Sequence, residues 1–381
     1  MTGRDIWRLG WMGLLLVCVG LAPPVWAQTS QEDLEKTYQE EQRAQLDAYF
    51  DKLLDASYPQ RAQAWKRDFD SVEAYDRSIA PWREKFAQYL GGMPYQAPDR
   101  DVRTELVRET ETHTAWRVWI PAFDQVEVYG VLLVPKRFAG PRPALLALHG
   151  MEGTPELVCG LVDRTDYHNR FGLQAVEQGY VVFAPVMMNG AKKRDWLDRK
   201  AIMVGQRMQG LEQFKMIRAV DYLVSRDDVA ADRVGVYGIS WGGRTAMYAA
   251  ALDRRLAACV VSGHFMESTV KMVRPSPHYT AYIEVDYNYP FFSRQATEFA
   301  DSDICSLICP RVLHIEQGRE DRVSYWKIAQ DEFRIVQGWY DRLGIGERAT
   351  FEIFAGGHFV AGQEAFVVLQ RWLKPGAAEG G

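Results

Sequence analysis

Short, continuous apolar runs from residue 144 onward constrain the fold more than any other feature. Runs of this kind are typical of strands that are buried on both faces of a sheet. Helical periodicity separates them, as in Phe214, Ile217 and Val220 on one face of a predicted helix. Strands that alternate with helices predict a mostly parallel, doubly wound α/β sheet. The runs are Ala144–Leu148, Tyr180–Ala184, Arg233–Tyr237, Ala257–Val261, Arg311–Ile315 and Thr350–Phe354.

The stretches before these runs show two other patterns. Residues 102–134 alternate between apolar and polar positions, which predicts antiparallel strands that open the sheet. Residues 31–90 carry apolar side chains three or four positions apart, which predicts helices. Glycines and prolines mark a boundary before residue 99. We therefore expect an N-terminal helical extension at residues 28–98, an α/β domain at 99–375 and a flexible tail at 376–381.

The first 27 residues have the organisation of a secretory signal peptide. Arg4 and Arg8 precede an apolar run at residues 11–21, and small Ala27 stands at the expected cleavage site. The run is shorter than the ~20 residues of a membrane-spanning helix. We expect a periplasmic or secreted protein without stable membrane insertion once the signal peptide is removed.

Composition and cysteine usage exclude several classes of protein. With 47% hydrophobic and 25% charged residues the chain has the composition of an ordinary globular protein. Its formal charge of -5 gives no excess of basic residues that would favour nucleic-acid binding. The chain has five cysteines and no C-x-x-C pair that would indicate zinc. Cys259 lies in an apolar run and is expected as a buried thiol, whereas Cys305 and Cys309 are the pair expected to form a disulfide in an oxidising compartment.

The segment Gly238-Ile-Ser-Trp-Gly242 lies between a predicted strand and a predicted helix. The chain must reverse direction there, and glycines allow the backbone to fold tightly. Ser240 is then held at the tip of the turn, in the G-x-S-x-G pattern of a nucleophile elbow.

Chemically suitable residues also follow the other predicted strands. Parallel strands place their carboxyl ends at one edge of a sheet, where ligands bind. A serine nucleophile needs a base, and the base needs a carboxylate to orient it. Asp321 and His358 supply these groups, in the chain order serine, acid, histidine. The backbone amides of Trp241 and Met151 are predicted to stabilise the oxyanion.

The acid is the least certain member of this set. Glu316 and Glu320 are local rivals to Asp321, and Glu267 is a remote alternative because it follows an earlier predicted strand. The three candidates remain open beside Asp321 at this point.

Two further groups of residues have weaker signals. His149, His168, Asp163 and Asp166 are spaced unlike the usual zinc patterns, so we predict no metal site there. Trp196 is expected in a solvated loop, where its ring could stack on a sugar or an aromatic ring. His264 follows a strand end and is expected to line the pocket.

Together these motifs resemble the α/β-hydrolase superfamily, and within it the dienelactone-hydrolase-like and acetyl-xylan-esterase-like serine esterases. The resemblance runs from about Pro81 to Trp372 and implies a carboxylic-ester hydrolase that needs no cofactor. Dienelactone hydrolases proper use a cysteine where this chain has Ser240, which counts against that activity. The motifs are Trp82-Arg83 to Leu90-Gly91, His149-Gly150, Gly179–Pro185, Asp221–Leu223, Gly238–Gly243, Pro310-Arg311, Gly318 with Asp321, and Gly356–His358.

We therefore expect a serine esterase that acts on a small or polysaccharide-derived ester outside the cytoplasm, such as an acetyl or uronate ester of a carbohydrate. The alternatives are a prolyl-oligopeptidase-like peptidase and a non-catalytic binding protein on the same fold. The N-terminal part lacks the repeated strands of a propeller, and all three triad residues are present.

Overall fold

The computed structural model describes residues 30–137, 140–188 and 190–374. The expected signal peptide and the expected tail at 376–381 lie outside these residues. The chain divides into two compact units at Leu53 and Leu54. Between residues 30 and 374, no helix of the described chain combines the length and apolar character needed to cross a bilayer.

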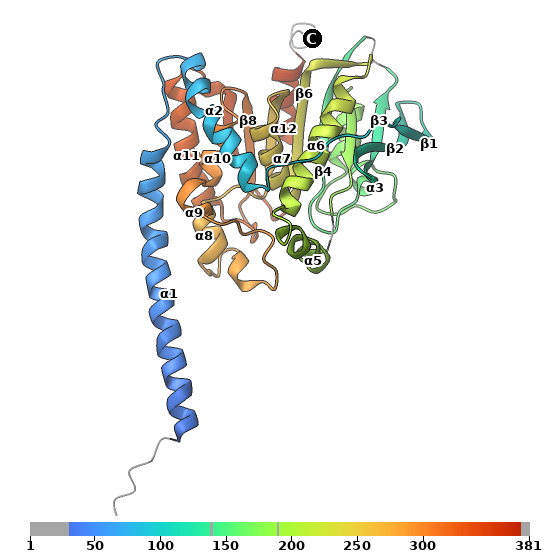
Figure 1. Cartoon of the computed structure of the whole chain (residues 1–381). Coiled ribbons are helices and arrows are strands. Elements are labelled where there is room, and N and C mark those ends of the chain that lie inside the picture. Colours follow the sequence, from blue (N-terminus) through green and yellow to red (C-terminus); the bar gives the residue numbers. More distant parts are fainter. Residues whose placement is uncertain (1–29, 138–139, 189, 375–381) are drawn as a thin grey trace, which may run out of the picture. The chain divides into compact units, whose positions relative to one another are not determined.

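The second unit contains a sheet of nine strands in the order β1-β2-β3-β5-β4-β6-β7-β8-β9. Figure 1 shows β1 at one edge of this sheet and β8 toward the other. The strands β1 to β3 pair antiparallel and join β5 antiparallel, and all the remaining pairs are parallel. The mostly parallel α/β sheet with antiparallel opening strands is thereby confirmed. The strands are β1 Arg103–Glu109, β2 His113–Phe123, β3 Val126–Pro135, β4 Arg142–Leu148, β5 Val181–Pro185, β6 Val229–Ile239, β7 Leu256–Ser262, β8 Val312–Gly318 and β9 Ala349–Phe354.

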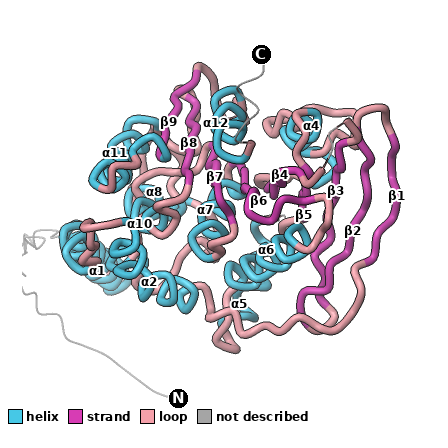
Figure 2. The backbone as a smooth tube through the Cα atoms, turned by 90° about the horizontal axis from the view of Figure 1, so that it is seen from above, coloured by secondary structure: helices cyan, strands magenta, loops and turns pink. Residues whose placement is uncertain are grey.

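Helices cover both faces of the sheet (Figure 2). One face packs against α6, α7 and α11, with α2 and α10 joined to the same core through α7, and the other face packs against α3, α4 and α12. The helices are α1 Gln31–Ala64, α2 Val72–Tyr89, α3 Pro155–Val158, α4 Phe171–Glu177, α5 Ala191–Ile202, α6 Met208–Val224, α7 Trp241–Leu252, α8 Ser268–Val273, α9 Gln295–Glu298, α10 Asp301–Ser306, α11 Trp326–Arg342 and α12 Gln363–Leu373, with short 3-10 turns at Tyr282–Glu284 and Gly346–Arg348.

The segment between residue 54 and the sheet belongs to the same compact unit as the sheet. Its aromatic side chains enter the main core: Trp65 stacks on Trp82 with ring centroids 4.4 Å apart, and Tyr75 and Phe86 are buried. A buried ion pair of 2.7 Å between Arg61 Nε and an Asp303 oxygen adds a polar attachment. The predicted helices of residues 31–90 therefore exist, and those after residue 54 form part of the hydrophobic core.

The expected disulfide between Cys305 and Cys309 is wrong. Both thiols are free and buried, as are those of Cys159 and Cys259. Disulfides need the two Cβ atoms to point toward each other. Cys305 instead directs its sulfur to Met247 Sδ at 3.5 Å, whereas the Cys309 thiol lies beside the hydroxyl groups of Tyr75 and Tyr340. Cys259 is a buried thiol in β7, as expected.

Candidate active site

Ser240 lies at the sharp turn between β6 and α7. Its φ of 58° and ψ of -123° lie outside the regions that L-residues usually adopt. The turn is held by backbone hydrogen bonds: the Ser240 N–H donates to Ser262 O at 2.8 Å, and the Arg244 N–H donates to Ser240 O at 3.1 Å. The side chain is half-buried at the carboxyl edge of the sheet.

The two glycines of the turn are required by close backbone approach. A Cβ atom on Gly238 would clash with the carbonyl oxygen of Gly242. A Cβ atom on Gly242 would clash with Leu148 O and would lie 2.6 Å from His149 O. The turn after β6 therefore packs directly on the end of β4, and any larger residue would push the two apart.

His358 lies in the loop after β9 and faces Asp321 in the loop after β8. The Nδ1 atom of His358 is 2.8 Å from Asp321 Oδ2, and the other carboxylate oxygen accepts the Val323 N–H at 2.7 Å. The Asp321 side chain is 1% exposed and that of His358 is 21% exposed. The carboxylate therefore fixes the Nδ1–H tautomer of the imidazole and leaves the lone pair on Nε2.

A single short segment after β7 joins the serine to the histidine pair. The carbonyl oxygen of Ser262 accepts the Ser240 N–H, and the next residue is Gly263, with φ 55°. A Cβ atom on Gly263 would lie 3.0 Å from His358 Nδ1 and 3.2 Å from Asp321 Oδ2. Ser240, Asp321 and His358 thus lie around the same end of β7.

The turn His149–Gly153 follows β4 and is fastened by two buried histidines. The Gly150 N–H donates to His168 Nε2 at 2.9 Å, and His168 Nδ1 lies 2.8 Å from Asp166 Oδ1. His149 Nε2 accepts the Met187 N–H at 3.0 Å, and burial lowers the pKa of His149 to about 4. Both imidazoles accept a backbone N–H at Nε2, and their Nδ1 atoms lie 2.8 Å from Gly150 O and Asp166 Oδ1, so protein groups occupy all four ring nitrogens.

The two predicted oxyanion donors belong to segments that contact each other. Trp241 is the first residue of α7, where backbone N–H groups lack partners within the helix. Met151 follows Gly150, whose Cβ position would be 3.1 Å from Ile239 O in the elbow strand. The assignment of the two amides as donors stays a prediction.

Two of the three rival acids have other hydrogen-bond partners. Glu267 is the N-cap of α8, and its two carboxylate oxygens accept the N–H groups of Thr269 at 3.0 Å and Val270 at 2.7 Å. Glu320 is exposed. Glu316 is buried within the sheet, where it accepts the Tyr237 hydroxyl at 2.7 Å and the Gly362 N–H at 3.0 Å. Asp321 is the carboxylate that pairs with His358.

The two predicted substrate contacts differ in their surroundings. His264 is 5% exposed, lies beside Gly243, and its pKa is well below the usual value because of burial. Trp196 is 65% exposed and belongs to α5, so the expectation of a loop was wrong. It lines a hollow of about 430 Å³ together with Met188 and Leu197. Substrate binding by either residue stays a prediction.

Sequence reasoning missed Arg194, a fully buried cation on α5. Its guanidinium forms an ion pair with Glu212, and its Cζ atom lies 4.6 Å from the centre of the Trp241 ring and 4.9 Å from that of Tyr289. Trp241 directly follows Ser240, so this cation–π contact of Arg194 stabilises the first turn of α7. The basic run at 192–194 is typical of a solvated loop. The burial of Arg194 depends on Glu212, which lies on another helix and is not indicated by the local sequence.

The neighbouring Asp195 ties α5 to a distant loop. Its Oδ1 atom accepts the N–H groups of Asn288 at 2.7 Å and Tyr289 at 3.1 Å. Arg207 adds a second tie, since it donates to Phe291 O at 2.8 Å. Hydrogen bonds from Asp195 and Arg207 therefore join the stretches 191–207 and 286–292.

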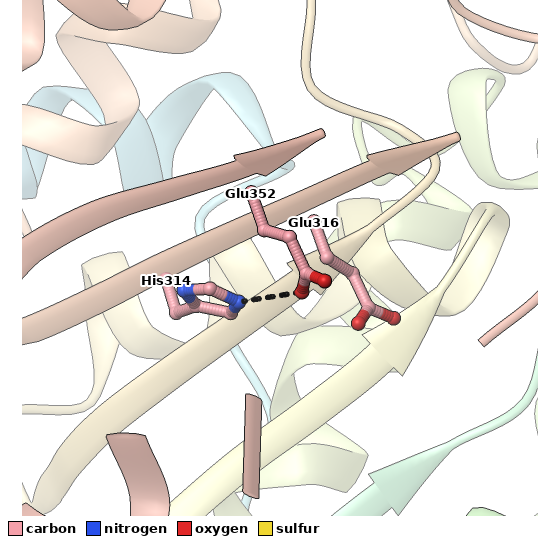
Figure 3. A group of neighbouring side chains, drawn as sticks. All are labelled: His314, Glu316 and Glu352. Atoms are coloured by element: carbon pink, nitrogen blue, oxygen red, sulfur yellow. Dashed lines mark ion pairs between the residues drawn. The ribbon is translucent and has the colours of Figure 1, made fainter. Parts of the chain in front are cut away.

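One group of described residues has the donor atoms that a metal ion needs. His314, Glu316 and Glu352 each place one donor atom within 4.8 Å of the others (Figure 3). The side chains project from one face of β8 and β9. Glu316 and Glu352 each lie two residues before the carboxyl end of their strand. Glu316 connects the group to the active-site loops, because Gly362 follows His358 by four residues and Tyr237 precedes Ser240 by three.

Residues 132–286 match the model of the Dienelactone hydrolase family. The matched range contains Ser240 and ends before Asp321 and His358. The protein YtaP of Bacillus subtilis (strain 168), described as a hydrolase, is 27% identical over 306 residues, which are 76% of this chain and 98% of YtaP.

Solved structures of esterases share the fold. A glucuronoyl esterase from Solibacter usitatus is 17% identical with a TM-score of 0.57, and the match covers 78% of this chain and 93% of that chain. An acetyl xylan esterase from Paenibacillus sp. R4 is 19% identical with a TM-score of 0.51, covering 82% of this chain and 97% of that one. At these identities the likeness establishes the α/β-hydrolase fold.

Proposed function

We propose that this chain, with its match to the Dienelactone hydrolase family, is a serine carboxylic-ester hydrolase that works through an acyl-enzyme. The observation that most supports this proposal is the 2.8 Å contact between His358 Nδ1 and Asp321 Oδ2. Gly263 lies against both side chains, and it directly follows Ser262, whose carbonyl oxygen accepts the Ser240 N–H. A strained serine, an oriented imidazole and a buried carboxylate are the groups that acyl transfer requires.

In the proposed reaction His358 Nε2 takes the proton of Ser240 Oγ as this oxygen attacks the ester carbonyl carbon. The negative charge on the carbonyl oxygen is stabilised by the amides of Trp241 and Met151. Collapse of the tetrahedral species breaks the ester C–O bond, and His358 returns the proton to the departing alcohol. A water molecule, deprotonated by the same nitrogen, then releases the acid and restores the serine.

The substrate we propose is an acetyl or uronate ester of a carbohydrate outside the cytoplasm. The support for the carbohydrate is that solved structures with the same fold are described as acetyl xylan and glucuronoyl esterases. The support for the location is the signal-peptide pattern of residues 1–27.

The test compares the wild type with Ser240→Ala on a small aryl acetate. The variant should lose turnover by about 10³-fold or more, because the oxyanion donors alone remain. The matched control is Ser225→Ala, an exposed serine at the end of α6, which should leave the rate unchanged. Equal rates in wild type and Ser240→Ala would refute the serine mechanism.

The substrate class needs a second measurement. A panel of acetyl, methyl and uronoyl esters of sugars should show the highest kcat/KM for an acetyl or uronoyl sugar ester. A clear preference for simple alkyl or lipid esters would leave the serine mechanism standing and would contradict the carbohydrate assignment.

A further inference from the structure

The sheet places three metal-ligand side chains together on one face of two neighbouring strands. His314 and Glu316 are two residues apart on β8 and therefore point to the same side. The register of β8 and β9 pairs Glu316 with Glu352. As Figure 3 shows, the imidazole Nε2 of His314 points toward the carboxylate of Glu352, and the Glu316 carboxylate lies beside them.

Two atoms of this group are buried without a hydrogen-bond partner. His314 is 2% exposed, and neither its Nε2 atom nor Glu352 Oε2 finds a partner. The two atoms face each other at 3.7 Å, which is too long for a hydrogen bond. Buried polar atoms nearly always have a hydrogen-bond partner or a ligand, so we expect a bound group between these two atoms.

The size of the gap suits a small transition-metal ion. Such an ion binds imidazole nitrogen at about 2.0–2.1 Å and carboxylate oxygen at about 2.0–2.2 Å, in tetrahedral geometry. Two donors of one tetrahedral ion are then roughly 3.4 Å apart, close to the distance between His314 Nε2 and Glu352 Oε2.

The outer contacts of His314 and Glu316 are those of oriented metal ligands. His314 Nδ1 is 2.8 Å from Thr350 Oγ1, so the opposite nitrogen is available to a metal. The two oxygens of Glu316 are held by the Tyr237 hydroxyl at 2.7 Å and the Gly362 N–H at 3.0 Å. Metal ligands are commonly fixed in this way by second partners.

The charges of the group also favour a cation. Two carboxyl groups lie close to one imidazole in a largely buried position, and a divalent ion would balance the negative charge that they carry when ionised. We propose that His314 Nε2, one oxygen of Glu316 and Glu352 Oε2 bind a divalent transition-metal ion of the Zn²⁺ type. The ion is a structural one, since it fastens β8 to β9 below the loops of Ser240 and His358. This proposal is independent of the proposed ester hydrolysis.

The test uses the full chain and Zn²⁺ as the probe. Protein treated with a chelator and then titrated with ZnCl₂ should take up about one ion per chain with a rise in Tm, because an ion that binds only the folded state stabilises it. His314→Gln should abolish both the uptake and the rise in Tm. The matched control His278→Gln changes an exposed histidine stacked on Tyr325 and should behave as the wild type.

Glu352→Gln provides a second variant if His314→Gln does not fold, because Glu352 is partly exposed. It should weaken Zn²⁺ uptake at least tenfold while the protein remains folded. A wild type that takes up no Zn²⁺ and gains no Tm would overturn the proposal and leave an ordinary ion pair between His314 and Glu352. Uptake that persists in both variants would overturn it as well.

Discussion

His358 and Asp321 lie 37 residues apart in the chain, yet their side chains meet at 2.8 Å in the loops after two adjacent strands. The loops are held together by backbone hydrogen bonds, with the Arg319 N–H donating to Phe354 O at 2.9 Å and the Glu320 N–H to Gly356 O at 2.8 Å. The imidazole and the carboxylate are therefore brought together by the pairing of β8 with β9.

This contact predicts which carboxylate supports the reaction. Asp321→Asn should lower kcat/KM for an aryl acetate by about 10²–10⁴-fold, because the amide no longer fixes the Nδ1–H tautomer. Glu267→Gln should leave kcat/KM within about threefold of wild type and lower stability by about 1 kcal/mol, because only a helix cap is weakened. Steady-state kinetics and urea unfolding of both variants provide the measurement. A larger kinetic loss in Glu267→Gln than in Asp321→Asn would reverse the assignment.

A second prediction concerns the crowded turn at Ser240. Gly242→Ala should lower stability by about 3 kcal/mol or more, because the new Cβ atom meets the carbonyl oxygens of Leu148 and His149. Gly338→Ala is the matched control, since its Cβ atom meets nothing within 4 Å and the residue is inside helix α11. The control should stabilise the protein by about 1 kcal/mol. Thermal unfolding distinguishes the two, and equal effects would contradict the close approach.

A third prediction is a pH dependence of stability that depends on Glu332. Burial raises the pKa of this carboxyl group to about 8, and its oxygens accept the Ser302 N–H at 3.2 Å and the Tyr58 hydroxyl at 3.0 Å. Between the ordinary value of 4.5 and about 8, the folded protein keeps a proton that the unfolded chain has lost. Stability due to this group is therefore present at low pH and is lost as pH rises through that window.

Glu332→Gln cannot lose a proton, so its stability should fall less than that of the wild type between about pH 5 and about pH 8. Between these two pH values the free energy of unfolding should fall by a few kcal/mol more in the wild type than in the variant, on the order of the linkage term. Urea unfolding of both proteins at the two pH values measures it. Parallel pH profiles would show that Glu332 is already ionised in the folded protein.

A fourth prediction follows from the buried thiols. Burial raises the pKa of Cys259 and Cys309 to about 12, and that of Cys305 well above its usual value. The thiolate is the reactive form, so a thiol reagent should modify none of the three in the folded protein. In denaturant without reductant all three should react, and peptide mass spectrometry should locate the label on each. A Cys305–Cys309 disulfide peptide would contradict the free thiols.

The sheet could be predicted because its signals are local. Each apolar run, such as Ala257–Val261 or Arg311–Ile315, carries its own burial pattern, and the alternation around Trp116 and Val118 marks the opening strands. The turn at Ser240 was predictable for the same reason, since two glycines and a strand-to-helix change stand within a few residues.

Contacts between distant side chains that no catalytic motif links could not be predicted. The basic run at Lys192 to Arg194 looks solvated in the sequence, and only tertiary structure brings Glu212 to Arg194. The pair Cys305 and Cys309 has a plausible spacing, but their thiols point to different neighbours. His314 and Glu352 became neighbours only through the register of β8 and β9, which one sequence does not specify.

The hydrogen bonds from Asn288 and Tyr289 to Asp195 have a consequence for the divergence of relatives. An insertion or deletion in the stretch 286–292 would displace the two amides, and the buried Asp195 carboxylate would lose both backbone donors while keeping its 2.6 Å ion pair with the exposed Arg199. A change within α5 would remove the acceptor from the other side. We therefore expect these two stretches, almost a hundred positions apart, to be replaced together between lineages, as one inherited module, while the strands beneath them stay the same.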